Sequence, residues 1–340
     1  MKLIKTEDAV GHVLCHDMTQ IIKDEFKGPR FRKGHVVRDE DIPVLLSMGK
    51  EHLYIWEMTP GMVHENDAAE RLADLCGNEG MVRSEAKEGK IELTAEYDGL
   101  FQVDSRRLRA VNSIDGLMIA TRHGNCAVRR GDKLAGTRII PLIIEEEKLC
   151  VADAAAENKP LLTLTPWKLK TAAIIATGSE VKKGLIQDTF TPVVKNKLGA
   201  YGVETLTVTY SGDGVDNVAD AIAAARRTGA DMILCTGGMS VDPDDNTPGG
   251  IKASGARIVT YGAPVLPGAM FLLGYFDDGT PVMGLPGCVM YAGATIFDLL
   301  LPRIVAGVEI TKADVVGLGE GGLCLGCKPC HWPDCPFGKR

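Results

Sequence analysis

The amino-acid sequence predicts an α/β fold. Its clearest part is a domain at residues 168–310, for which we expect a parallel-type sheet flanked by helices. One observation behind this prediction is that strand-like apolar runs alternate with helical segments after residue 170, as right-handed crossovers between parallel strands require. A second is that glycine-rich loops follow those strands, where open α/β sheets bind their ligands.

The expected strands and helices of this domain follow one another in regular order. The β-branched and alanine-rich run Thr171–Ala176 is the first predicted strand. The helix, strand, helix and strand expected after it are Thr189–Lys197, Glu204–Tyr210, Val215–Arg227 and Asp231–Cys235. Because a helix separates each strand from the next, we expect the strands to be parallel.

Smaller segments precede this domain. Residues 1–85 are predicted to be an α+β segment, with a short helix ended by Gly49, a strand at His52–Trp56 and a helix at Asn66–Cys76 closed by Gly77. Residues 86–160 are predicted to be a small, mostly β subdomain, with strands expected at residues 90–97, Leu117–Ala120, Cys126–Val128 and Arg138–Ile144. Glu157–Pro166 is the expected linker.

Composition and charge exclude several classes of protein. The net charge of −7, with charges of both signs mixed along the chain, argues against general binding to nucleic acid or anionic membranes. An anionic ligand would therefore be held locally, by backbone amides or a few basic side chains. The longest apolar run near the end, Gly293–Gly307, contains Asp298, Pro302 and Arg303 and is too short to cross a bilayer. Because the N-terminus also lacks an apolar signal region, we expect a cytoplasmic protein.

Three sets of loops combine glycine with polar residues, and they are residues 177–189, residues 236–247, and the pair 266–268 and 285–288. A Gly-Gly pair such as Gly237-Gly238 lets backbone amides approach an anion without β-carbons in the way, and the hydroxyl of Ser240 or Thr236 adds a donor. Nearby carboxylates suit donors on a heterocycle, or a divalent ion. Any one of these turns alone would be ordinary structure. Their order and spacing together predict a site for a ligand with a phosphate and a hydrogen-bonding ring.

The order of these loops resembles a known family. Residues 171–307 are similar to the molybdopterin-binding domain shared by MoeA, MogA, gephyrin and CinA. The matching segments, in order, are the TGxE turn Thr177-Gly178-Ser179-Glu180, the segment Gly184–Thr189, Asp213, the [ST]-G-G-x-S-x loop Thr236–Val241 and the LPG turn Leu285-Pro286-Gly287. More loosely, residues 9–14 and 32–49 resemble the N-terminal part of MoeA-type chains.

The resemblance implies a molybdopterin site and the roles of its residues. Gly237, Gly238 and Ser240 would hold the phosphate end. The acidic set around pterin and metal, with catalytic roles, would be Glu180, Asp188, Asp213 and Asp245. The other ligand-binding residues implied are Thr177, Gly178, Ser179, Thr236, Met239, Asp242, Pro267, Gly268, Pro286 and Gly287. The function implied is molybdopterin molybdotransferase activity, which inserts molybdate into molybdopterin from its adenylate with the help of Mg²⁺, in a homo-oligomer.

Departures from the family pattern leave two alternatives open. MoeA has a K-P-G-K-P turn where this chain has Leu266–Met270 without lysines, and fewer residues follow Gly307 than the C-terminal β domain of MoeA needs. These differences favour a non-catalytic molybdopterin carrier or accessory protein for a molybdenum or tungsten enzyme. A CinA-like nucleotide hydrolase is a further alternative, because residues 242–248 resemble the loop of that branch. Cys288 replaces a family asparagine, either as a thiolate stabilised at a helix start or as a small packed residue.

The ten cysteines fall into two groups. Six are scattered, as reduced core thiols would be, and they are Cys15, Cys76, Cys126, Cys150, Cys235 and Cys288. The others form a C-x2-C-x2-C-x4-C run in a predicted cysteine-rich tail at residues 320–340, and they are Cys324, Cys327, Cys330 and Cys335. This spacing predicts a zinc site or an iron–sulfur cluster, with His331 as a further ligand. The alternative is a tail of reduced thiols or chance disulfides.

Overall fold

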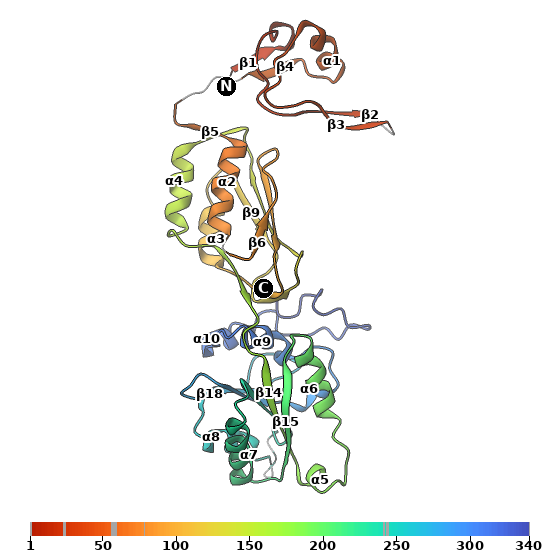
Figure 1. Cartoon of the computed structure of the whole chain (residues 1–340), viewed down its shortest axis with the longest axis vertical. Coiled ribbons are helices and arrows are strands. Elements are labelled where there is room, and N and C mark those ends of the chain that lie inside the picture. The colour runs from red at the N-terminus through yellow and green to blue at the C-terminus, as the bar shows by residue number, and fades with distance from the viewer. Residues whose placement is uncertain are drawn as a thin grey trace. The chain divides into compact units, whose positions relative to one another are not determined.

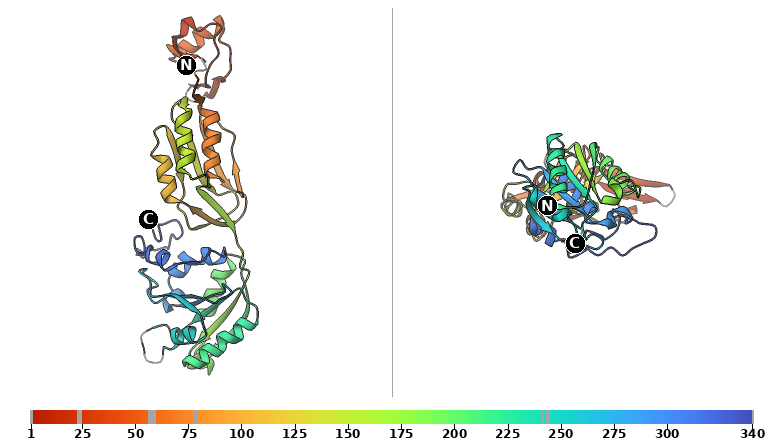
Figure 2. Two further views of the ribbon diagram at one scale, coloured as in Figure 1. Left: turned by 90° about the vertical axis from the view of Figure 1, so that its left-hand side faces the viewer. Right: turned by 90° about the horizontal axis from the view of Figure 1, so that it is seen from below.

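The computed structural model describes residues 2–22, 25–55, 60–77, 79–240, 242 and 245–339. Contacts divide the chain into two compact units. The first unit contains residues 1–97, 102–122 and 130–164, and the second contains residues 98–101, 123–129 and 165–340. Each unit is described separately below (Figures 1 and 2).

The second unit is built on a six-stranded sheet with the strand order β15-β14-β16-β19-β18-β17. These strands are Glu204–Ser211, Thr171–Thr177, Met232–Thr236, Pro281–Leu285, Leu272–Tyr275 and Arg257–Tyr261, in that order across the sheet. The first four strands in this order are parallel, as predicted. β18 is antiparallel to both β19 and β17, which the sequence analysis did not predict.

Helices cover both faces of this sheet (Figure 1). Ala172 and Ile174 of β14 lie in one core with α6 (Phe190–Gly199) and α9 (Ile296–Val305). Their neighbours Ala173 and Ile175 lie in the opposite core with α7 (Val215–Arg227) and α8 (Thr247–Ala253). Because β14 is buried on both faces, its sequence is a continuous apolar run rather than an alternating one.

The predicted elements of this unit are confirmed with small shifts of their ends. α7 has the predicted bounds, while α6 extends to Gly199 and β16 begins at Met232. Short helices complete the unit, namely α5 (Ser179–Lys182), the 3₁₀ turn Gly287–Met290 and α10 (Lys312–Val316). α9 begins with a capping box in which Thr295 and Asp298 bind each other's backbone N–H groups.

The N-terminal part of the first unit has a small core of its own. β1 (Lys2–Lys5) pairs with β4 (His52–Ile55), and β2 (Met18–Ile22) pairs with β3 (Phe26–Phe31). The predicted short helix is a 3₁₀ turn at Asp39–Asp41 followed by α1 (Ile42–Ser47). Trp56, the end of the predicted strand, lies outside the described residues.

The rest of the first unit joins helices to a four-stranded antiparallel sheet with the order β6-β7-β11-β9. These strands are Met81–Arg83, Lys90–Ala95, Lys133–Ile139 and Leu117–Thr121. The predicted helix is α2 (Glu65–Cys76), which packs on β7 and β11. A separate pair joins β5 (Met62–His64) to β12 (Ile143–Glu145).

Three predictions for residues 86–166 were incomplete. The segment predicted as mostly β also contains α3 (Ser105–Asn112) and α4 (Glu146–Ala155), and each of these helices buries only two residues. The strand predicted at Arg138–Ile144 is interrupted near Pro141, which has no N–H to donate. The predicted linker contains β13 (Leu162–Pro166), which joins β8 (Gly99–Val103) and β10 (Cys126–Val128) in a three-stranded sheet.

Among the residues that the structure describes, no helix has both the length and the apolar character needed to span a bilayer.

Replacing Leu234 by alanine tests the central position of β16 in the core. Leu234 is fully buried, so Leu234→Ala is expected to lower the free energy of unfolding by about 2–5 kcal/mol, because the cavity refills only partly. Leu185 provides a control because it is 71% exposed. Leu185→Ala is expected to change the free energy of unfolding by less than about 0.5 kcal/mol. Urea unfolding followed by circular dichroism measures both. Equal effects of the two substitutions would contradict the assignment of this core.

Candidate functional site

The carboxyl ends of four parallel strands meet at one edge of the six-stranded sheet. Thr177 at the end of β14 is paired with Ser211 of β15, and Thr236 of β16 is paired with Ala176 and with Leu285 of β19. The loops that follow these strands therefore begin side by side. They contain most of the residues that the resemblance assigned to the site.

The turn after β16 requires two consecutive glycines. Gly237 and Gly238 have φ of 85° and 57°, in the left-handed region. A β-carbon at Gly237 would lie 2.4 Å from the carbonyl oxygen of Thr177, and one at Gly238 would lie 2.8 Å from Oγ1 of Thr247. The glycines thus let this turn approach β14 and α8 more closely than any other residue would allow.

A pair of buried threonine hydroxyls holds this turn in place. Thr177 Oγ1 donates a hydrogen bond to the carbonyl oxygen of Thr236 at 2.9 Å and lies 3.0 Å from Oγ1 of Thr247. The backbone N–H of Thr247 donates to the carbonyl oxygen of Gly238 at 3.2 Å. Sequence reasoning missed Thr247 as a site residue, although the proline after it, typical of a first helical turn, marks the start of α8.

Ser240 and Asp245 close the loop that begins with the glycines. The backbone N–H of Ser240 donates to Oδ2 of Asp245 at 2.8 Å, and the N–H of Asp245 donates to the carbonyl oxygen of Asp242 at 2.9 Å. Ser240 and Asp242 are exposed, while Asp245 is half-buried. Val241, Pro243 and Asp244, which complete the matching motif, lie outside the described residues.

Asp213, after β15, binds the turn that follows β14. Its Oδ2 accepts the backbone N–H of Ser179 at 2.9 Å. Hydrogen bonding from the Ser179 side chain lowers the pKa of Asp213, and the nearby Lys183 adds to this effect against the opposing effect of burial. Asp213 is therefore held as a carboxylate at the edge of the sheet. Lys182 lies beside the same loop, since its Nζ is 3.8 Å from a β-carbon placed on Gly212.

The remaining two acidic residues of the predicted set differ in their surroundings. Glu180 is exposed on α5, with Oε2 3.8 Å from a β-carbon placed on Gly178. Asp188 caps α6, because its Oδ1 accepts the N–H groups of Phe190 and Thr191 at 2.9 and 3.0 Å. Its Oδ2 is buried and has no hydrogen-bond partner among the described residues. The catalytic roles that the resemblance gives to these residues stay predictions.

Several other predicted ligand residues pack against the core or against α9. Met239 is only 4% exposed, and its sulfur lies where a side chain at Gly284 would stand, so it is part of the core under the loop. Pro267 accepts the N–H of Ile296 at 3.3 Å, and Gly268 packs directly on Ile296 at the start of α9. In contrast, a side chain on Gly287 would meet nothing within 4 Å. Of the two turns at residues 266–268 and 285–288, the one at Gly287 is therefore the one with free space beside it.

Tyr261, at the end of β17, is a further residue that sequence reasoning missed. Its hydroxyl donates to the carbonyl oxygen of Met239 at 3.2 Å, although the residue is 45% exposed. Burial raises the pKa of this hydroxyl, and the charge of Asp245 raises it further. No sequence motif marks this tyrosine, because only the antiparallel edge of the sheet brings it to the glycine loop.

The prediction that the six scattered cysteines are core thiols is confirmed for three of them and wrong for Cys150, which is exposed, while Cys126 and Cys288 are partly buried. Cys15, Cys76 and Cys235 are buried, and burial raises the pKa of Cys76 and Cys235 to about 12. Burial also raises the pKa of Cys288, so the structure does not support a stabilised thiolate at that position. Among the described residues, no three His, Cys, Asp or Glu side chains lie close enough together to hold one metal ion.

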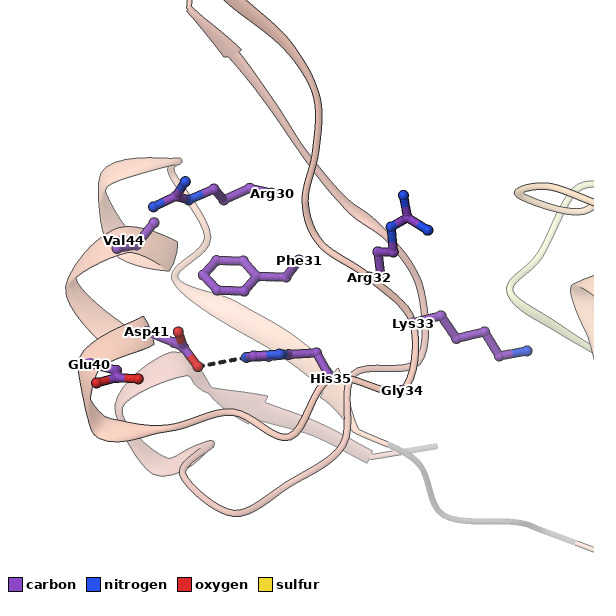
Figure 3. A pocket seen from close by; sticks show the side chains of 9 residues that line it. All are labelled: Arg30, Phe31, Arg32, Lys33, Gly34, His35, Glu40, Asp41 and Val44. Atoms are coloured by element: carbon purple, nitrogen blue, oxygen red, sulfur yellow. Dashed lines mark hydrogen bonds and ion pairs between the residues drawn. The ribbon is translucent and has the colours of Figure 1, made fainter.

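A pocket of about 660 Å³ lies in the first unit, between β3 and α1 (Figure 3). Arg30 lies over Val44 on one side, and Nε2 of His35 lies 2.7 Å from Oδ2 of Asp41 below Phe31. Burial acts to raise the pKa of Asp41, but hydrogen bonds from His35 and the N–H of Arg38 outweigh it and lower the pKa. This pocket contains none of the residues that the sequence analysis assigned to a site.

Substitution of Gly237 tests whether the close approach to β14 is required. Gly237→Ala should destabilise the protein by more than the cost of a left-handed residue, about 1–2 kcal/mol, because the new methyl group also collides with Thr177. Gly229→Ala is the matched control, since Gly229 has a similar φ of 76° and nothing within 4 Å of an added β-carbon. Unfolding in urea measures both variants, and equal losses would show that the turn is not closely packed.

The interaction of Asp213 with Ser179 predicts a pH dependence. A carboxyl group whose pKa is lowered by folding stabilises the protein above its unfolded pKa, and this stabilisation is lost as pH falls through the folded pKa. Asp213→Asn should therefore be less stable than the natural protein at pH 7, and the difference should shrink below about pH 4. Asp220→Asn, an exposed change on α7, controls for net charge. A difference that stays constant down to pH 3 would contradict the prediction.

Two segments of the chain match models of protein families. Residues 173–306 match the model of a family described as a probable molybdopterin binding domain, and residues 3–57 match a domain of unknown function (DUF8806). A CinA-like protein of Desulfosudis oleivorans is 39% identical over 88 residues, which are 25% of this chain and 21% of that protein. A CinA-like protein of Mycobacterium avium is 33% identical over 76 residues, or 22% of this chain and 18% of that protein.

Solved structures also resemble part of the chain. A putative molybdenum cofactor biosynthesis protein from Corynebacterium diphtheriae is 19% identical, with a TM-score of 0.33, over 42% of this chain and 99% of that chain. The tungsten cofactor synthesizing protein MoaB from Pyrococcus furiosus is 19% identical, with a TM-score of 0.34, over 40% of this chain and 93% of that chain.

The matches to the curated relatives span about a fifth of the length of those proteins. The family match itself covers the whole set of loops at the edge of the sheet, from Thr177 to Gly287. Residues 173–306 are therefore a molybdopterin-binding domain of the superfamily to which the MoeA, MogA and CinA-type proteins belong.

Proposed function

We propose that this protein acts in molybdenum cofactor biosynthesis by binding molybdopterin or its adenylate and inserting molybdate. The observation that carries the proposal is the Gly237-Gly238 turn at the meeting point of the parallel strands. The missing β-carbons let the turn pack against Thr177 and Thr247, and its successive backbone N–H groups would bind an anion as such groups do in other glycine turns. Hydrogen bonds of Thr177 and Asp245 hold the loop in place. Its backbone amides would therefore already be ordered before the ligand binds.

The charges around the turn suit a ligand with two chemically different ends. Lys182 and Lys183 lie beside the Asp213 loop and would attract a phosphate. The carboxylates of Asp213 and Asp245 would accept hydrogen bonds from the amino and ring N–H groups of a pterin. A phosphorylated pterin carries both kinds of group, which is why we favour it over a simple phosphate.

Mg²⁺ would depend on the ligand for part of its coordination. Among the described residues, no three carboxylates converge on one point, so these residues alone offer no complete site. Oδ2 of Asp245 accepts a backbone N–H, and its other oxygen would be the one to contact an ion. Asp213 accepts hydrogen bonds from both the backbone and the side chain of Ser179, so it would contribute less. Mg²⁺ commonly takes one or two carboxylates together with phosphate oxygens and water, and this arrangement fits the residues present.

A second candidate function is that of a molybdopterin carrier for a molybdenum or tungsten enzyme. The turn in which MoeA has two lysines is here Leu266-Pro267-Gly268, and it packs on Ile296 instead of presenting basic side chains. Without those charges, binding of molybdate at this turn has less electrostatic support. The pterin would then bind at the glycine loop without reacting.

Binding and turnover can be measured in one preparation. The protein is mixed anaerobically with adenylated molybdopterin and Mg²⁺, with or without molybdate, and pterin binding and AMP release are followed. We expect Asp245→Ala to weaken pterin binding by about tenfold to a hundredfold, the effect of losing one hydrogen bond to a charged group. Asp220→Ala, an exposed change on α7, is expected to bind like the natural protein.

Each result selects one function. Molybdate-dependent release of AMP that is lost in Asp245→Ala supports the molybdotransferase. Tight binding without AMP release supports the carrier, and release that does not require molybdate supports the CinA-like nucleotide hydrolase. Failure of the natural protein to bind either form of the pterin overturns the proposal.

A further inference from the structure

The C-terminal segment of residues 322–339, here called the tail, is fixed at both ends to the core of the second unit. At its start, Leu323 bridges to Leu266, and the N–H of Cys324 donates to the carbonyl oxygen of Leu266 at 2.8 Å. At its end, Phe337 is only 3% exposed, in the same core as α9, and Gly338 packs on Leu299. The residues between these anchors therefore form a closed loop on the surface.

The loop between the anchors has little internal structure. Residues 324–336 form neither helix nor strand, and Leu325 is 76% exposed. A segment of this length buries too little apolar surface to fix its own conformation, and short segments of this kind are commonly stabilised by metals or disulfides. The anchors fix the two ends of the loop, and its middle has no helix or strand to hold its conformation.

The four thiols of the tail are distributed along this loop. Cys324 and Cys335 are partly buried and pack against the same core as Trp332. Cys327 and Cys330 are exposed, and Sγ of Cys330 lies over Gly293, 2.8 Å from where its β-carbon would be. All four are free thiols in the structure. They do not converge on one point, so a ligand that uses all of them must draw the middle of the loop inward.

We propose that Cys324, Cys327, Cys330 and Cys335 together bind one thiophilic metal centre, either a zinc ion or an iron–sulfur cluster. Four thiolates are the full ligand set of a tetrahedral structural zinc site and equally of a four-cysteine cluster. Cys324 and Cys335 lie beside the two anchors, and the exposed segment with Cys327 and Cys330 would have to move to complete the site. Each thiol loses its proton on binding, so the affinity rises with pH.

The metal centre would also stabilise a turn at the site edge of the sheet. The N–H of Leu266 donates to the carbonyl oxygen of Gly322 at 2.8 Å, which ties the start of the tail to the Leu266-Pro267-Gly268 turn. Gly268 packs on Ile296 at the start of α9. Metal binding is thus expected to raise the thermal stability of the second unit, independently of any pterin.

Metal content and absorption spectra test this proposal without reference to activity. Full-length, untagged protein is purified anaerobically from cells supplied with zinc and iron, and its metals and acid-labile sulfide are measured. We expect about one zinc ion, or one iron–sulfur cluster, per chain. Zinc gives a colourless protein without sulfide, whereas a cluster gives visible absorption with iron and sulfide. Cys327→Ser and Cys330→Ser should lose the metal and melt at a lower temperature.

Cys150→Ser is the matched control, because Cys150 is also an exposed free thiol but lies in the first unit. It should retain the full metal content and melting temperature. The proposal is overturned if the natural protein remains free of metal after reconstitution with Zn²⁺ and with Fe²⁺ and sulfide. It is also overturned if the two tail variants keep as much metal as Cys150→Ser, or if thiol titration of anaerobic protein shows the tail cysteines in disulfides.

Discussion

The contact between the end of β14 and the Gly237-Gly238 turn determines the arrangement of the site. Thr177 donates its hydroxyl hydrogen to the carbonyl oxygen of Thr236 and receives a hydrogen bond from Thr247, so one buried side chain links β14, β16 and α8. This contact is sterically possible only because Gly237 has no β-carbon. The strand ends, the glycine turn and the start of α8 are consequently held together by hydrogen bonds and close packing.

The charged side chains at this edge of the sheet are acidic and basic residues in neighbouring loops. The chain is acidic overall, with a net charge of −7, so the phosphate of the proposed ligand would have to be held by local groups. Two of the acidic residues there, Asp213 and Asp245, accept hydrogen bonds from backbone N–H groups and so hold the loops together. They keep their negative charge, which an anionic ligand would have to meet. Lys182 at the end of α5 and Lys183 after it supply positive charge locally. Local charge matters here because the chain as a whole is acidic.

The parts outside the molybdopterin-binding domain are stabilised by different means. The N-terminal part of the first unit depends on a small core that includes Leu14, Phe31 and Leu45. The tail has no core of its own, and its Phe337 packs in the core that contains α9. Small segments of both kinds can bury little apolar surface, so their conformations depend on contacts with larger neighbours or on bound ligands.

The sequence by itself determined the regular part of the α/β domain and the composition of its loops. Strands such as β14 are buried on both faces and so appear as unbroken apolar runs, and α7 has a strong apolar stripe, which makes both visible in a single sequence. Helices α3 and α4 were missed because each buries only two residues, and one of the two in α3 is the charged Arg107.

Only the tertiary structure decided which side chains meet at the site. The antiparallel edge strands bring Tyr261 to the glycine loop, and Thr247 reaches Thr177 across 70 residues of sequence. Asp188 matched a family motif, and the structure shows that it caps α6. Local sequence specifies which residues a loop contains, whereas their contacts depend on strand order and register, which are set by packing between segments distant along the chain.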